Sequence, residues 1–302
     1  MKQPPEWYDQ QYNARAGIPD AAAIVRSWAD RSAATRARGR CVLDVPYTEA
    51  GASDPSERLD LFLPDAAPAG GGLAPVLLHI HGGYWRALHK EDQSFVAEAY
   101  TAAGALVVVP NYALCPQVSI AHIVMQMVQA IAWTWRHAPR YGGDRSRIVV
   151  TGHSAGGHLA AMMLACDWPA FAPDLPAGLV GTAVPVSGLF DLEPLRHAPF
   201  LAPDIGLTRA EAQRLSPARL PAPRSGRAQL LAFVGALESP EFHRQGERIR
   251  RAWGDAVVPV CEPVPGCHHL SVLHALGDPA TRLNRAVRGA LGLPGADGSG
   301  AD

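Results

Sequence analysis

The sequence lacks the features that mark a secreted or membrane-spanning protein. Its five cysteines are an odd number in a chain of 302 residues and form no C-x-x-C pair, so we expect free thiols in a reducing compartment instead of a disulfide framework. The polar and aromatic N-terminus has no apolar core of a secretory signal. No stretch of about 18 apolar residues is present to span a membrane. These absences predict a cytoplasmic protein.

The sequence also lacks an excess of charge of either sign, because it has 27 basic and 28 acidic residues and the two are mixed along the chain. Nucleic-acid binding ordinarily needs a basic surface, and this chain has no basic run to form one. An apolar fraction of 48% with 18% charged residues predicts a sizeable folded core. We expect the protein to bind a small-molecule substrate, and neither nucleic acid nor a membrane. A homodimer is a candidate assembly.

Short apolar segments typical of β-strands recur along the chain, and helical patterns separate most of them. They are residues 41–47, 57–63, 75–81, 105–111, 147–152, 181–187, 228–235 and 256–262. The second segment alternates between apolar and polar residues, which suits a half-exposed strand in an antiparallel pair. The later segments are almost continuously apolar, as in strands covered on both faces. The pattern predicts a mostly parallel, doubly wound sheet of about eight strands with helices on both faces.

Helical signals and composition predict the remaining organisation. Residues 119–135 carry an apolar face at helical spacing, and Ser239-Pro240 and Asp278-Pro279 are each typical of a helix start. The stretches 1–40 and 190–227 do not follow the strand–helix rhythm, and we expect them to form a small cap over the strand ends. The expected units are an N-terminal helical segment at 1–40, a main domain at 41–292 that contains the 190–227 insertion, and a disordered tail at 293–302.

A lone serine, Ser154, lies where the fifth segment ends and a small-residue helix at 155–166 is predicted to begin. The motif G-H-S-A-G in this setting is typical of a nucleophile elbow, a sharp strand-to-helix turn that exposes the serine hydroxyl. Gly152 and Gly156 lack the Cβ atoms that would clash in such a turn. The amide of Ala155 and the helix N-terminus would then stabilise a developing oxyanion.

A glycine pair, Gly82 and Gly83, follows the third segment and is the second candidate part of a site. Acyl transfer needs at least two N–H donors directed at one oxygen. We expect these amides to be the donors, with Tyr84 as a further one. His79 and His81 form an H-x-H pair nearby, but the sequence offers no third ligand beside them. We therefore expect no metal site.

A serine nucleophile needs a base and an acid that orients the base. His269 lies on the loop after the last strand segment, where the base belongs in the chain order serine, acid, histidine; His268 is the alternative. The acid is expected after the seventh segment, which favours Glu238. Asp191, after the sixth segment, is the alternative acid, whereas Glu241 is expected to interact with the dipole of the helix that contains it.

These motifs together resemble the arylformamidase branch of the α/β-hydrolase fold, also called kynurenine formamidase, near the hormone-sensitive-lipase-like esterases. The matching stretches cover most of the chain and are WYDQQYNARAGIPD (7–20), HGGYW (81–85), NYALCP (111–116), GHSAGGHLAA (152–161), SGLFDLEPL (187–195), VGALESPEF (234–242) and GCHHLSVL (266–273). The tryptophan of HGGYW and the G-x-x-H-[FL]-S-V-L ending are the more specific parts. The sequence departs from the animal enzymes in having glutamate instead of aspartate as the acid, and NYALCP lacks the arginine of the lipase-like Y-R-L-x-P.

The resemblance implies hydrolysis of N-formyl-L-kynurenine to kynurenine and formate, without a cofactor and through a formyl-serine. Carried over motif by motif, it makes Ser154 the nucleophile, Glu238 the acid and His269 the base. The oxyanion donors that it implies are Gly82, Gly83 and Ala155. A carboxylesterase for short acyl or aryl esters is the alternative function, and a non-catalytic binding protein of the same fold is a remote one.

Aromatic residues beside these motifs are candidate walls of a pocket for an aryl substrate, and they are Tyr84, Trp85 and Phe190. An arginine that binds a carboxylate would separate kynurenine-type substrates from simple esters. Arg86 and Arg196 are the candidates for this role, and the sequence favours neither.

Overall fold

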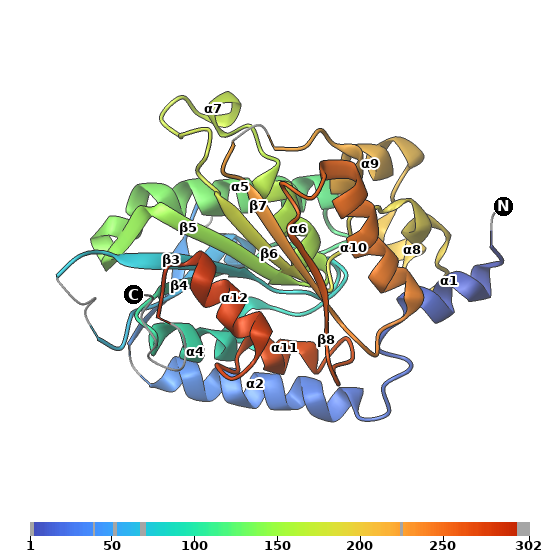
Figure 1. Cartoon of the computed structure of the whole chain (residues 1–302), viewed down its shortest axis with the longest axis horizontal. Helices are drawn as coiled ribbons and strands as arrows, with labels where there is room; N and C mark the ends of the chain where they lie inside the picture. Colours follow the sequence, from blue (N-terminus) through green and yellow to red (C-terminus); the bar gives the residue numbers. More distant parts are fainter. Residues whose placement is uncertain (1–2, 39, 51–52, 67–70, 224–225, 295–302) are drawn as a thin grey trace.

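In the described part of the chain, a mixed eight-stranded sheet forms the centre of the molecule (Figure 1). The computed structural model describes residues 3–38, 40–50, 53–66, 71–223 and 226–294. The strands are β1 (Cys41–Pro46), β2 (Arg58–Phe62), β3 (Ala74–Ile80), β4 (Leu106–Pro110), β5 (Gly143–His153), β6 (Thr182–Val186), β7 (Gln229–Gly235) and β8 (Val260–Val264). They lie side by side in the order β1-β2-β4-β3-β5-β6-β7-β8.

The strand β2 runs against the direction of its neighbours. It pairs antiparallel with both β1 and β4, whereas every pair from β4 through β3 and β5 to β8 is parallel. Parallel neighbours must be joined by a crossover on one face of the sheet, usually through a helix. The prediction of an α/β fold with a mostly parallel, doubly wound sheet is confirmed.

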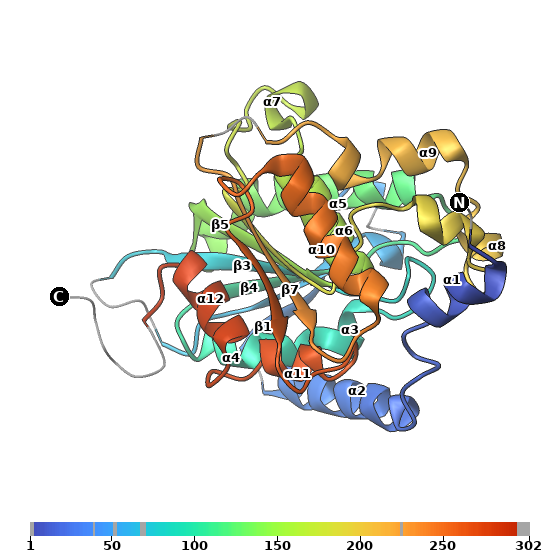
Figure 2. The ribbon, with the colours of Figure 1, turned by 45° about the vertical axis from the view of Figure 1, so that its right-hand side comes forward.

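Helices cover both faces of this sheet. The α-helices of the described residues are α1 (Pro5–Tyr12), α2 (Ala21–Ala37), α3 (Lys90–Gln93), α4 (Ala97–Thr101), α5 (Ile120–His137), α6 (Ala155–Leu164), α7 (Trp168–Phe171), α8 (Ala202–Ile205), α9 (Arg209–Arg214), α10 (Pro240–Trp253), α11 (Val272–Leu276) and α12 (Arg282–Ala290). Figure 1 and Figure 2 show α5, α6 and α10 on one face and α2, α4, α11 and α12 on the other. Side chains alternate between these two cores along a strand, so Leu78 of β3 packs in the first core and Leu77 in the second.

Two sequence expectations for the C-terminal third are wrong in detail. β8 begins at Val260 instead of residue 256, because the chain first closes a turn in which the Val258 amide donates to the Gly254 carbonyl at 2.9 Å. No helix begins at Asp278-Pro279. The Asp278 carboxylate accepts a nearby main-chain amide in a tight turn, and α12 begins only at Arg282.

The two segments expected to form the cap have different places in the fold. α1 packs against the 190–227 segment, where the Asp9 carboxylate accepts from the Phe200 amide at 3.2 Å. α2 instead packs against α3 and contributes to the second core. Of the tail that we expect to be disordered, residues 295–302 lie outside the described residues.

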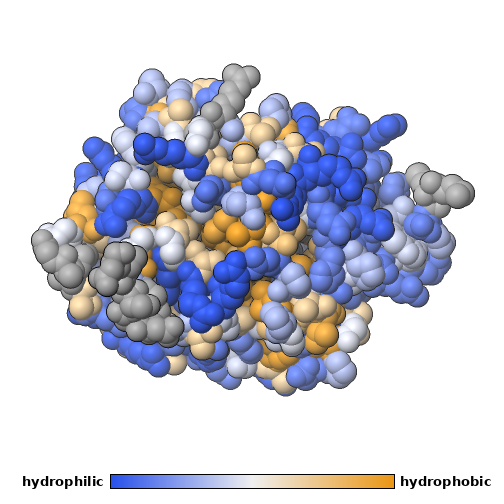
Figure 3. Space-filling view, in the orientation of Figure 1, coloured by the Kyte–Doolittle hydropathy of each residue, from blue (hydrophilic) through white to orange (hydrophobic). Residues whose placement is uncertain are grey.

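The surface shown in Figure 3 is polar over much of its area, with apolar residues in separate patches. Among the described residues, Leu237 is the most exposed large apolar residue, with 67% of its surface accessible. No helix within those ranges is long and apolar enough to cross a membrane.

Lys90 is fully buried and joins three elements through its charge. Its Nζ donates to Asp60 of β2 at 2.8 Å and to Asp44 of β1 at 2.7 Å, and Asp60 also pairs with Arg36 of α2. The side chains of Lys90 and Asp60 have no exposed area. The hydrogen bond from Lys90 holds the pKa of Asp44 below its ordinary value. Because a buried charge is tolerated only with partners, this cluster fixes α2 and α3 against the first two strands.

We expect Asp60→Ala to lower the free energy of unfolding by about 3 kcal/mol, because the buried Lys90 ammonium then faces only carboxylates that are half exposed to water. Urea unfolding followed by circular dichroism measures this change. Asp30→Ala removes an exposed carboxylate from α2 and should change the free energy by no more than about 0.5 kcal/mol. Equal values for the two variants would contradict the role of the cluster.

Candidate active site

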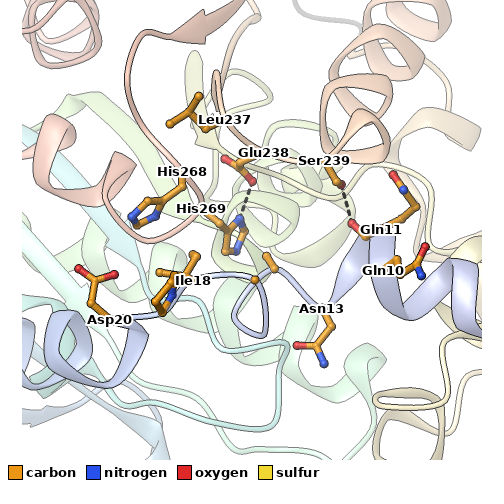
Figure 4. A pocket seen from close by; sticks show the side chains of 13 residues that line it. Gln10, Gln11, Asn13, Ile18, Asp20, Leu237, Glu238, Ser239, His268 and His269 are labelled. Atoms are coloured by element: carbon orange, nitrogen blue, oxygen red, sulfur yellow. Dashed lines mark hydrogen bonds and ion pairs between the residues drawn. The ribbon is translucent and has the colours of Figure 1, made fainter.

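Loops at one edge of the sheet bring the predicted site residues together. Gly82 follows β3, Ser154 follows β5, Glu238 follows β7 and His269 follows β8. Parallel strands present their carboxyl ends at the same edge, so loops far apart in the sequence meet there. Figure 4 shows Glu238 and His269 facing the loop that joins α1 to α2.

Ser154 occupies the sharp turn between β5 and α6 that the sequence predicts. Its backbone has φ 57° and ψ −116°, which is strained for a residue with a side chain. α6 begins so close to the sheet that a Cβ on Gly156 would lie 2.0 Å from the carbonyl oxygen of Ile80, so glycine is required there. The Ser154 amide donates to the Val186 carbonyl at 2.8 Å, which fixes the turn to the end of β6.

The serine, histidine and glutamate form one hydrogen-bonded chain. Ser154 Oγ lies 3.1 Å from His269 Nε2, and Nδ1 of the same ring lies 2.6 Å from Glu238 Oε2. An ionised carboxylate only accepts, so Nδ1 carries the proton and Nε2 is left to accept the serine proton. Ser154 is 2% exposed and His269 6%. This arrangement is the one that a serine nucleophile, its base and an orienting acid require.

Glu238 is held by two further donors through its second oxygen. Oε1 accepts from the Gly235 amide at 2.7 Å and from the hydroxyl of Ser187. Ser187 follows β6 directly and has a φ of 52°. The sequence analysis did not single out Ser187, although a hydroxyl residue at the carboxyl end of a neighbouring strand was an available signal. Three hydrogen bonds therefore orient the carboxylate toward His269.

The alternative acid and base have other partners. Asp191 accepts from two arginines at 3.0 and 3.1 Å. The ring of His268 accepts from two main-chain amides of its own loop, each at 3.2 Å. Glu241 is buried in the first turn of α10 and accepts from the Tyr12 hydroxyl at 2.8 Å, a contact that its expected role at the helix dipole did not include.

Gly82 and Gly83 lie directly beside the serine. A Cβ on Gly82 would be 3.3 Å from Ser154 Cβ and 2.8 Å from the carbonyl oxygen of His153, so glycine allows the two loops to approach this closely. Gly83 has a φ of 106°, which favours glycine. Among the described residues, none accepts a hydrogen bond from the amides of Gly82, Gly83 or Ala155. These N–H groups are therefore free to bind an oxygen next to the serine.

Two buried histidines of the motifs support these loops. The His81 ring stacks on Tyr112 with centroids 4.0 Å apart, and the Tyr112 hydroxyl lies within hydrogen-bond distance of the His81 and Gly82 carbonyls. His153 Nε2 donates to the main-chain carbonyl of His269 at 2.7 Å. Burial lowers the pKa of His81 to about 3 and that of His153 well below its ordinary value. Both rings are therefore neutral and act as supports, a role that the sequence analysis did not assign to them.

In the described part of the chain, two cavities border His269, and both are closed on one side by the loop at Asn13 and Ala14. The larger, of about 470 Å³, lies between this loop and the loops of Glu238 and His268 (Figure 4). The smaller, of about 150 Å³, contains Ser154. Its apolar and aromatic walls are Val25, Trp28, Tyr84, Leu88, Phe200 and Leu270.

The predicted pocket residues divide between cavity and core. Tyr84 lines the smaller cavity, but Trp85 and Phe190 line neither cavity and belong to the first core, at 0% and 2% exposure. Their prediction as pocket residues is wrong, because large rings in tightly packed loops are buried by the hydrophobic effect. Trp28 and Phe200, which belong to the two segments expected to form the cap, line the cavity instead.

The two arginines considered as carboxylate anchors are engaged elsewhere. Arg86 lines the smaller cavity, but its Nη1 donates to the Phe200 carbonyl at 2.7 Å and pairs with Asp204. Arg196 pairs with Glu193 at 2.7 Å and lines neither cavity. Part of each guanidinium is therefore already engaged within the protein.

Comparison with known proteins assigns this geometry to a family. The family described as BD-FAE matches residues 59–167. Kynurenine formamidase from Danio rerio is 30% identical over 268 residues, which cover 87% of this chain and 86% of that protein. This chain belongs to the kynurenine formamidase family of α/β-hydrolases. Kynurenine formamidase from Salmo salar is 28% identical over 267 residues, or 85% of each protein.

Esterases and solved structures agree with this family. Esterase LipQ from Mycobacterium tuberculosis is 34% identical over 154 residues, which are 49% of this chain and 35% of LipQ. A crystal structure from Silicibacter sp. TM1040, described as a thioesterase, has a TM-score of 0.76 and 31% identity over 90% of this chain and 95% of that one. This member of the kynurenine formamidase family is therefore a hydrolase of the amide- or ester-cleaving kind.

We expect Ser187→Ala to lower kcat of this hydrolase about tenfold, because Glu238 loses one of its donors but keeps the Gly235 amide. Steady-state kinetics on any substrate that the wild type cleaves measures the change. Ser32→Ala is the control. Ser32 lies in α2, away from the site, and its equally buried hydroxyl accepts from the Phe95 amide. A kcat that is unchanged in Ser187→Ala would contradict the orienting role.

The neutral buried histidines should make the protein sensitive to acid. Burial lowers the pKa of His79 and of His158 to about 4, whereas an unfolded chain titrates near the ordinary value of about 6.5. Between these values the unfolded chain binds more protons, so the free energy of unfolding falls as the pH falls. Each such histidine contributes up to about 1.4 kcal/mol per pH unit.

Urea unfolding between pH 4.5 and pH 7.5 measures this slope. His158→Gln should reduce the slope by the contribution of one titrating histidine, up to about 1.4 kcal/mol per pH unit. The exposed His122, substituted in the same way, is the matched control and should leave the slope as in the wild type. Identical slopes in all three proteins would show that the buried ring of His158 does not titrate on unfolding.

Proposed function

We propose that this protein hydrolyses an aryl formamide, N-formyl-L-kynurenine, to kynurenine and formate. The observation that carries the proposal is the hydrogen-bonded chain of Ser154, His269 and Glu238 beside a cavity with aromatic walls. Its volume of about 150 Å³ suits one aromatic ring, because a cavity of this size holds benzene in another protein. Relatives named kynurenine formamidase, at 30% and 28% identity, support this substrate.

In the first step, Ser154 Oγ bonds to the formyl carbon while His269 Nε2 takes the hydroxyl proton. Glu238 accepts from Nδ1 throughout and stabilises the imidazolium that forms. The amides available to the oxyanion are those of Gly82, Gly83 and Ala155. Each donor of this kind lowers a barrier by about 3 to 4 kcal/mol. The C–N bond then breaks, and the imidazolium gives its proton to the leaving aryl amine.

In the second step, water attacks the formyl-serine. His269 takes a proton from the water as its oxygen bonds to the formyl carbon, and it returns a proton to Ser154 Oγ as the ester bond breaks. Formate leaves and the free serine is restored. The close approach of Gly82 to the serine supports a small acyl group at this point, since a formyl group carries only hydrogen on its carbonyl carbon.

A carboxylesterase is the second candidate function. The same three side chains can attack an ester carbonyl, and the esterase relatives favour this reaction. The cavity of about 470 Å³ that also borders His269 could receive a longer acyl or alcohol group. A non-catalytic binding role is disfavoured because binding proteins of this fold usually lack a member of the triad.

We expect wild-type protein to form kynurenine from N-formyl-L-kynurenine, and Ser154→Ala to lose this activity by several orders of magnitude, about a millionfold in a comparable triad. Absorbance of the aryl amine product measures the rate. Circular dichroism establishes that the variant is folded, which a loss of a single hydroxyl should permit.

Hydrolysis of p-nitrophenyl acetate is measured in parallel on the same two proteins. Turnover of the ester alone would assign the carboxylesterase function and refute the formamidase proposal. Turnover of neither substrate would favour the binding role. Turnover of both by Ser154→Ala at the wild-type rate would exclude this serine as the nucleophile.

A further inference from the structure

The smaller cavity contains a second cation besides the engaged Arg86. Arg15 lines the cavity together with Ser154 and His269, and its side chain is exposed to solvent. No carboxylate among the described residues lies within ion-pair distance of it, and no described side chain or carbonyl accepts from its guanidinium. Arg15 is therefore available for a ligand in a way that Arg86, bonded to Asp204, is not.

The loop that carries Arg15 is fixed relative to the reacting groups. The Tyr84 hydroxyl, next to the glycine pair, donates to the Tyr12 carbonyl. The same carbonyl accepts from the Ala14 amide at 2.8 Å, and the Ile18 amide donates to the Arg15 carbonyl at 3.3 Å. The backbone of the loop is thus tied to the loop of the predicted oxyanion donors, so a ligand held by Arg15 has a defined position relative to the serine.

The charges of the two cavities differ. Of the described residues that line the smaller cavity, none is acidic, and burial keeps the His153 ring neutral. Because Arg86 is paired with Asp204, Arg15 supplies the unpaired positive charge of this cavity. The larger cavity contains the carboxylates of Asp20 and Glu238. An anionic group is therefore attracted to the smaller cavity, on the side of Arg15.

We propose that Arg15 binds the α-carboxylate of an amino-acid substrate while the aryl formamide occupies the cavity. This inference rests on the proposed function. A cavity of about 150 Å³ holds little more than the aryl ring and its formyl group, so the amino-acid chain of N-formyl-L-kynurenine must extend to the mouth, where Arg15 is exposed. A guanidinium presents parallel N–H groups that match the two oxygens of a carboxylate.

The anchor separates two classes of substrate. Simple esters and neutral formamides have no carboxylate and gain nothing from Arg15. The contact is distant from the reacting carbonyl and is the same in the ground state and the transition state, so it lowers KM and leaves kcat unchanged. Arg15 is accordingly a specificity-determining residue and takes no part in the chemistry.

The kinetic test compares N-formyl-L-kynurenine with N-(2-acetylphenyl)formamide, which keeps the aryl formamide but lacks the amino and carboxylate groups. We expect Arg15→Gln to raise KM about tenfold for the first substrate only, with kcat unchanged. Arg15→Lys keeps the charge but not the paired donors, so its KM for N-formyl-L-kynurenine should lie between those of the wild type and Arg15→Gln. Arg26→Gln removes an exposed arginine of α2 that lines neither cavity and should change nothing.

Calorimetric titration with L-kynurenine and with 2-aminoacetophenone gives a second readout that needs no catalysis. Arg15→Gln should weaken binding of L-kynurenine about tenfold and leave 2-aminoacetophenone unaffected. If the wild type cleaves no formamide, the proposed function fails, and the titration still decides the role of Arg15. Equal changes for both compounds, or no change for either, would overturn the assignment of the carboxylate anchor.

Discussion

The site depends on how closely the start of α6 approaches the sheet. The backbone at Gly156 lies against the carbonyl of Ile80, with no room for a Cβ between them. That approach forces the chain to turn within one residue, and Ser154 adopts a strained backbone as a consequence. The strain lifts the hydroxyl out of the sheet edge and brings the Ala155 amide beside it. The core formed by α5 and α6 on this face of the sheet compensates for the strain.

Burial gives the charged and neutral groups around this turn different roles. The buried Glu238 carboxylate accepts from a ring nitrogen, an amide and a hydroxyl, which satisfy it away from water. His81 and His153 are buried with carbonyl oxygens or packed rings as neighbours and stay neutral. The site therefore has one imidazole, that of His269, whose ring joins a carboxylate to a hydroxyl. The neighbouring histidines hold main chain in place and do not compete for the serine proton.

Chemistry and specificity come from different parts of the chain. The reacting groups follow parallel strands, so the sheet positions them rigidly. The proposed anchor and part of the walls come from the segment before the first strand, which contributes Asn13, Arg15 and Trp28. Several contacts attach this segment to the rest of the site, among them the hydrogen bonds from Tyr84 to the Tyr12 carbonyl and from Ser239 to the Gln11 carbonyl. Relatives with the same fold could thus keep the triad geometry and differ in substrate through this segment.

The sequence by itself determined the fold class and the positions of Ser154, His269, Glu238 and the glycine pair, because each is encoded locally: strands by periodicity, the turn by glycines, and the order of the loops by the order of the strands. Tertiary structure alone decided which side chains share a cavity. Trp85 and Phe190 lie within motifs but are buried in the core, whereas the structure brings Ser187, Arg15 and Trp28 to the site, a place that local patterns did not assign to them. Local patterns specify backbone conformation, but the neighbours of a side chain depend on how elements distant in the sequence pack together.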